Sequence, residues 1–109
     1  MHDLRRLIDE VDGQLLDLLV ERFEIAEDVA SHKLKAGIEP RIAARIRHVI
    51  NDRENRGRRL GLPARSARQI WTSIVEETCR YEEALFRRGS LAPDSSRKKT
   101  RRPRAQAAP

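Results

Sequence analysis

The sequence is poor in aromatic residues and in cysteine, and both shortages narrow the possible folds. Aromatic residues make up 4% of the 109 residues and charged residues 37%, a balance typical of helical proteins rather than of β-sandwiches. The single cysteine, Cys79, excludes a disulfide within the chain. No apolar run approaches the roughly 18 residues of a membrane span, and the charges at Asp3 and Arg5 are not typical of a secretory signal. We therefore expect a cytoplasmic protein.

Positive charge is concentrated towards the C-terminal end. Residues 90–109 contain six Lys or Arg side chains and one acid, whereas residues 1–89 contain 17 basic and 16 acidic side chains. Residues 90–109 also lack apolar periodicity. The composition therefore predicts one helical domain over residues 1–89 and a basic, disordered tail over residues 90–109.

A long amphipathic helix is predicted over residues 3–36. Its seam alternates spacings of four and three, as in a heptad pattern: Leu4, Ile8, Val11, Leu15, Leu18, Arg22, Ile25 and Val29. Such a helix is roughly 50 Å long, whereas a compact chain of this size has a radius of gyration of about 13 Å. The rest of the chain is too short to cover this apolar face. We therefore expect the helix to pair with a second copy in an intertwined homodimer.

Two more helices follow, so the predicted fold class is all-α, a three-helix chain with a long N-terminal helix. Gly37 is expected to end the first helix. The second helix is predicted over residues 41–60, and one side carries Ile42, Ile46, Val49, Ile50 and Arg53. The third is predicted over residues 63–88, with Pro63 at its first position, and one stripe carries Trp71, Val75, Thr78, Glu82 and Leu85.

Several polar side chains interrupt faces that are otherwise apolar. Arg22 takes a seam position of the first helix, and Lys33, eleven residues later, points nearly the same way. Two cations on one apolar face are costly unless an anion meets them, although both could instead reach the surface or pair with acids of other helices. By pattern alone, Arg45 reads as a solvated residue, Glu82 could equally form an internal salt bridge, and Arg5 is an ordinary surface residue.

Together these side chains predict a site for a small, multiply anionic ligand. Arg binds planar carboxylates through paired hydrogen bonds, and Lys acts as a point donor. The histidines show no metal-ligand spacing with Cys79 or with acids, and the five glycines form no phosphate-binding loop. We therefore expect no metal and no cofactor, and a reaction that depends on binding, orientation and electrostatics.

Over residues 3–88 the chain resembles the all-helical (type II) chorismate mutase family. The resemblance is carried by residues 4–12, 15–22, 29–33, 61–62 and 74–78, and by the spacing of Arg5, Arg22, Lys33 and Arg45. It implies an intertwined dimer of three-helix chains. It also implies a cofactor-free [3,3] Claisen rearrangement of chorismate to prephenate.

The resemblance also implies a role for each site residue. Arg22 binds one substrate carboxylate, and Arg5 of the partner chain helps to bind the other. Lys33 donates hydrogen bonds to a carboxylate and to the ether oxygen. Arg45 supports the charged pocket, and Thr78 lies where a small hydroxyl residue commonly lines the site.

Three positions depart from the usual pattern of the family. Glu82 replaces a Gln of bacterial members that donates to the ether oxygen, and a carboxyl can donate only when it is protonated. Fungal members carry Glu here, so the sequence predicts a catalytic Glu82 and an activity that falls as the pH rises. Ile42 and Ile46 replace acids, the second of which contacts the ring hydroxyl of chorismate in the usual mutases.

These departures leave the substrate open. The 4-amino-4-deoxychorismate mutases resemble this chain in an apolar residue after the matching Arg45 and in a counterpart of residues 80–82, so the amino analogue is an alternative to chorismate. Isochorismate pyruvate lyases share the apolar residue but keep the Gln, which makes a lyase a weaker alternative. A non-enzymatic helical dimer that binds nucleic acid through residues 97–104 is opposed by the near-neutral body of the chain. We therefore expect a small dicarboxylate as ligand, and neither nucleic acid nor a membrane as partner.

Overall fold

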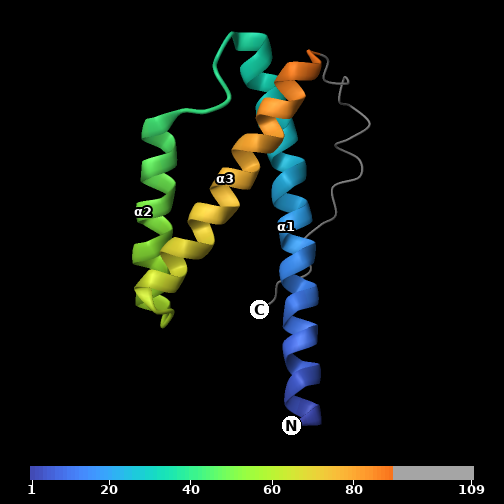
Figure 1. Cartoon of the computed structure of the whole chain (residues 1–109), viewed down its shortest axis with the longest axis vertical. Helices are drawn as coiled ribbons and strands as arrows, with labels where there is room; N and C mark the ends of the chain where they lie inside the picture. Colours follow the sequence, from blue (N-terminus) through green and yellow to red (C-terminus); the bar gives the residue numbers. More distant parts are fainter. Residues whose placement is uncertain (90–109) are drawn as a thin grey trace, which may run out of the picture.

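The chain folds into three helices joined by two short connections (Figure 1). The structure is a computed structural model that describes residues 1–89. Helix α1 spans His2–Ala36, α2 spans Ala43–Leu60 and α3 spans Ala64–Arg88. The predicted all-α class with a long N-terminal helix is confirmed, and the predicted tail over residues 90–109 lies outside the described residues.

The helix ends differ from the sequence-based expectations at two points. Gly37 ends α1 in the left-handed conformation, with φ 71°, as expected of a residue without a Cβ. Helix α2 begins two residues later than predicted, because Ile42 is extended, with φ −116° and ψ 105°, and Arg41 belongs to the connection. Pro63 caps α3 from outside, rather than occupying its first position, because its ψ of 133° is not helical.

Helices α2 and α3 form the main core. Val49, Val75 and Cys79 are buried together, and Ile46, Ile50 and Trp71 pack against them. The crossing of the two helices is close at Gly57, where an added Cβ would lie 2.9 Å from the Cβ of Ala67. Gly57 therefore allows α3 to approach the end of α2.

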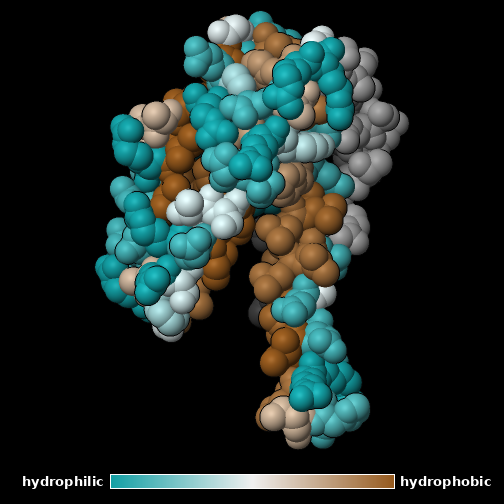
Figure 2. Space-filling model, in the orientation of Figure 1, coloured by the Kyte–Doolittle hydropathy of each residue, from teal (hydrophilic) through white to brown (hydrophobic). Residues whose placement is uncertain are grey.

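Helix α1 packs on α3 through its C-terminal half alone. Ala26 and Ala30 are its buried residues, and their small side chains let the two helices approach. The N-terminal half projects beyond the other helices (Figure 1), and apolar residues colour its surface brown in Figure 2. The exposed residues of this half include Leu4, Ile8, Val11, Leu15 and Leu18.

The arrangement leaves a space between α1 and α2 that α3 closes on one side. Helix α3 contacts both of the other helices, whereas within residues 1–89 no close packing joins α1 to α2. The principal extents of 49 × 31 × 25 Å reflect the projecting end of α1. Within the same residues, no helix combines the length and the apolar character that crossing a bilayer requires.

Candidate active site

The space between the helices contains a cavity of about 420 Å³ that all three helices line. Its size falls within the range of small-molecule sites. Much of its wall is apolar, and its charged or hydroxyl side chains come from every helix: Arg22, Lys33, Arg45, Arg53, Thr78 and Glu82.

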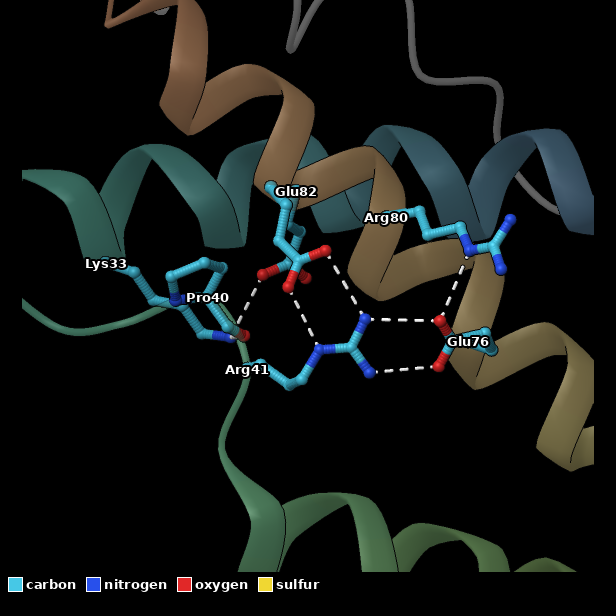
Figure 3. A network of polar contacts seen from close by, with 7 residues as sticks. Lys33, Pro40, Arg41, Glu76, Arg80 and Glu82 are labelled. Atoms are coloured by element: carbon cyan, nitrogen blue, oxygen red, sulfur yellow. Dashed lines mark hydrogen bonds and ion pairs between the residues drawn. The ribbon is translucent and has the colours of Figure 1, made fainter.

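Part of the cavity wall is formed by an ion pair between α1 and α3. The Nζ of Lys33 donates to the Oε1 of Glu82 over 3.0 Å and to the carbonyl oxygen of Pro40 over 2.7 Å (Figure 3). Glu82 is 6% exposed, so this carboxyl is removed from water and depends on its protein partners. The internal salt bridge considered for Glu82 is therefore present, and Lys33 is the partner rather than an arginine.

Arg22 is held to α3 by a different contact. Its Nη1 donates to the Oγ1 of Thr78 over 2.7 Å, and that hydroxyl donates in turn to the carbonyl oxygen of Ile74 over 2.7 Å. Burial lowers the pKa of Arg22 from its ordinary value, and the charges of Arg53 and Arg45 lower it further. Positive charge is therefore crowded around Arg22, which favours the binding of an anion.

The second helix supplies a wall that combines apolar and cationic residues. Ile42, Ile46 and Val49 line the cavity from α2 and its N-cap, and Arg45 reaches the same space from an exposed position. Among residues 1–89 neither Arg22 nor Arg45 has a carboxylate within ion-pair distance, whereas Lys33 is neutralised by Glu82. Two guanidinium groups that form no ion pair in this part of the chain match the charge of a dicarboxylate ligand.

The connection between α1 and α2 is fixed to α3 by Arg41. This guanidinium donates two hydrogen bonds to Glu76, at 2.9 and 3.2 Å, and two to Glu83, at 3.0 and 3.3 Å (Figure 3). Glu76 also accepts a hydrogen bond from Arg80. These bonds lower the pKa values of Glu76 and Glu83, so the contact is present at neutral pH and is lost as the pH falls through the lowered values. Because Pro40 precedes Arg41, the same contact positions the carbonyl group that holds Lys33.

The structure brings six of the seven expected site residues to this cavity: Arg22, Lys33, Arg45, Ile46, Thr78 and Glu82. Arg5 does not line it, because it lies on the projecting half of α1, seventeen residues before Arg22 and about 25 Å away along the helix. In a single chain Arg5 is therefore exposed and has no contact with the site.

Sequence reasoning assigned no role to three groups that shape the site. The Pro40 carbonyl holds Lys33, Arg41 fixes the connection, and Arg53 lines the cavity. The carbonyl group of Pro40 and the hydrogen bonds of Arg41 correspond to no periodic pattern that a sequence could reveal. The position of Arg53 could be predicted from the sequence, since it falls eleven residues after Ile42, on the same face of the second helix.

Fold and cavity together define a class of protein. It is a helical protein whose three helices line one cavity, with guanidinium groups, an ion pair and a hydroxyl in its wall. Among residues 1–89 no group of three His, Cys, Asp or Glu side chains is arranged to hold a metal ion.

Comparison with known proteins identifies the family within this class. Residues 4–83 match the family model of chorismate mutase type II, and the chain belongs to that family. It is 28% identical over 95 residues to a 4-amino-4-deoxychorismate mutase of Streptomyces venezuelae, a match that covers 86% of this chain and 91% of the relative. The comparison with solved structures found no match. The chain is therefore an isomerase of the chorismate mutase type, acting on a small molecule.

Proposed function

We propose that this cavity catalyses the [3,3] rearrangement of 4-amino-4-deoxychorismate, with chorismate as the second candidate substrate. The observation that carries the proposal is that Arg22 and Arg45, which form no ion pair within residues 1–89, share one cavity with the Lys33–Glu82 ion pair. A dicarboxylate supplies the two negative charges that Arg22 and Arg45 lack. The Lys33–Glu82 ion pair then lies next to the ether linkage between the two carboxylates of the substrate.

The reaction needs no group from outside the substrate. The ether C–O bond of the enolpyruvyl group breaks while a C–C bond forms to the ring, and the electrons move within one six-membered array. Negative charge develops on the ether oxygen as the C–O bond lengthens. Lys33 donates to that oxygen and stabilises the transition state more than the substrate. Glu82 donates a second hydrogen bond to it only after taking up a proton, because in the structure its carboxylate accepts from Lys33.

The substrate's carboxylates are held by the cations of the cavity. Arg22 binds one of them, and its contact with Thr78 fixes the guanidinium before the substrate arrives. Arg45 adds positive charge from α2, close to the apolar side chain of Ile46. The rigid grip of two carboxylates favours the compact chair that the rearrangement requires.

The apolar wall of α2 supports the amino analogue as substrate. Ile42 and Ile46 offer no acid to a ring hydroxyl, which is the contact that the resemblance to chorismate enzymes leads us to expect. The relative of Streptomyces venezuelae carries the name of an enzyme for the amino analogue. The membership of the chorismate mutase family keeps chorismate as the second candidate.

Parallel assays with three substrates test this proposal. Chorismate, 4-amino-4-deoxychorismate and isochorismate are each incubated with the full chain at about pH 5 and about pH 8, and products are identified by mass. We expect a prephenate-type product with the highest kcat/KM for the amino compound. A higher kcat/KM for chorismate would reassign the substrate. Salicylate and pyruvate from isochorismate alone would replace the mutase by a lyase.

We also propose that the chain works as a cytoplasmic, intertwined homodimer in which Arg5 enters the site of the partner. The apolar side chains on the projecting half of α1 are exposed in the single chain, among them Leu4 (58%) and Ile8 (60%). A second copy of α1 would bury them, and the hydrophobic gain favours association. Arg5 lies on the same projecting half, so pairing would carry it towards the other chain.

Subunit mixing tests the dimer and the role of Arg5 together. Arg5→Ala and Arg22→Ala are each expected to be nearly inactive, because every site then lacks one of the two cations. Mixed and re-associated, they form heterodimers in which one site holds both arginines. Random pairing then restores about a quarter of the wild-type activity. A monomeric mass, or no recovery on mixing, would refute the shared site.

A further inference from the structure

Arg53 is a cation of the cavity to which neither the resemblance nor the proposed reaction assigns a task. It lies on the cavity face of α2, where Ile42, Ile46 and Val49 precede it at spacings of eleven, seven and four residues. Its side chain is 27% exposed, so it is largely withdrawn from solvent, in contrast to the exposed Arg45.

The charge of Arg53 is balanced in a way that leaves most of its donors free. Its Nη1 donates to the Oδ2 of Asp52 over 2.6 Å, which is its sole ion pair within residues 1–89. A guanidinium has five N–H donors in a planar fork, so one contact leaves the others for a ligand. Asp52 therefore acts as a counterion that keeps Arg53 at the cavity wall without saturating it.

Arg53 and Arg22 act on the same region of the cavity. Both line it, from α2 and from α1, and the charge of Arg53 is the largest charge effect among those that lower the pKa of Arg22. Lys33 and Glu82 line the same cavity and pair with each other. Asp52 offsets only part of the repulsion between the two guanidinium groups, and an anion bound to both offsets the rest.

We infer that Arg53 is a substrate-binding residue, which together with Arg22 clamps one carboxylate of the substrate. The inference rests on the proposed function, because it assumes a dicarboxylate substrate. The clamp gives each chain two guanidinium groups of its own for that carboxylate, before any residue arrives from a partner. Arg53 also sets specificity, since a substrate without an anionic group for this clamp would leave the repulsion between Arg22 and Arg53 in place.

The test compares Arg53→Leu with Arg56→Leu and Arg53→Lys. Arg56 is the matched control, because it also contacts Asp52, at 3.5 Å, but is more exposed, at 60%, and does not line the cavity. Loss of a charge-assisted hydrogen bond is expected to raise KM roughly 10- to 100-fold in Arg53→Leu, with a smaller change in kcat. The KM of Arg53→Lys is expected to lie between those of the wild type and Arg53→Leu, because an ammonium keeps the charge but not the paired hydrogen bonds of a guanidinium.

A binding measurement without turnover separates this inference from the proposed function. Prephenate, a dicarboxylate, is titrated by calorimetry into the wild type and the three variants, and melting curves confirm that each variant is folded. Weaker binding in Arg53→Leu but not in Arg56→Leu supports the clamp, even if the wild type turns over neither candidate substrate. Equal Kd and KM values in these two variants would overturn it, as would a wild type that binds no prephenate.

Discussion

Replacing Thr78 by valine should weaken substrate binding by Arg22, although Arg22 itself is unchanged. Valine has nearly the shape of threonine, so the change removes the acceptor of the 2.7 Å bond from Arg22 and, with it, the hydroxyl's own bond to the carbonyl oxygen of Ile74. The N–H group left behind belongs to a charged, partly buried side chain whose pKa burial already lowers. Leaving such a donor unpaired costs about 1.5–3 kcal/mol. We therefore expect kcat/KM to fall roughly 10- to 100-fold.

Thr78→Ser is the control, because it keeps the hydroxyl and removes only a methyl group. We expect its kcat/KM to stay within about threefold of the wild type. Steady-state rates with the better of the two candidate substrates, and melting temperatures, are measured for both variants. If valine and serine variants differed by less than twofold in kcat/KM, the hydroxyl would not position Arg22 and the reasoning would be wrong.

Three further predictions follow from the same structure. Glu82→Gln should make kcat/KM less dependent on pH between about 5 and 8, because an amide donates a hydrogen bond to the ether oxygen at both pH values without taking up a proton. A pH profile equal to that of the wild type would contradict a donating carboxyl at position 82. Gly57→Ala should lower the melting temperature, since its Cβ would lie 2.9 Å from that of Ala67 and overpacking costs about 1–3 kcal/mol. Gly13→Ala, where an added Cβ meets nothing within 4 Å, is its control and should raise the melting temperature. Removal of residues 90–109 should leave kcat and KM unchanged, and a loss of activity would place part of the site there.

The helices were predictable because their signals are local. The seam of α1 repeats over many turns, and Gly37 supplies the left-handed conformation that ends it. The start of α2 was not predictable to the residue. Arg41 is drawn out of the helix by four hydrogen bonds to Glu76 and Glu83, which lie more than thirty residues away in the sequence.

The site was partly predictable because a charge on an apolar face is conspicuous. Arg22, Lys33 and Glu82 stood out by position, and the structure places all three at one cavity. Their partners were not predictable from the pattern. Lys33 joins Glu82 across 49 residues, and Arg22 selects Thr78 rather than a carboxylate across 56.

By itself, then, the sequence determined the number and type of the helices and the cations on their inner faces, because periodicity and residue chemistry are local properties. The tertiary structure decided which of those charges meet. Within residues 1–89, packing of α3 between α1 and α2 pairs Lys33 with Glu82, leaves Arg22 and Arg45 without an ion pair, and adds Arg53 to the wall. The pairing of Lys33 with Glu82 depends on the crossing of α1 and α3, where α1 buries the small residues Ala26 and Ala30, and no single segment contains that information.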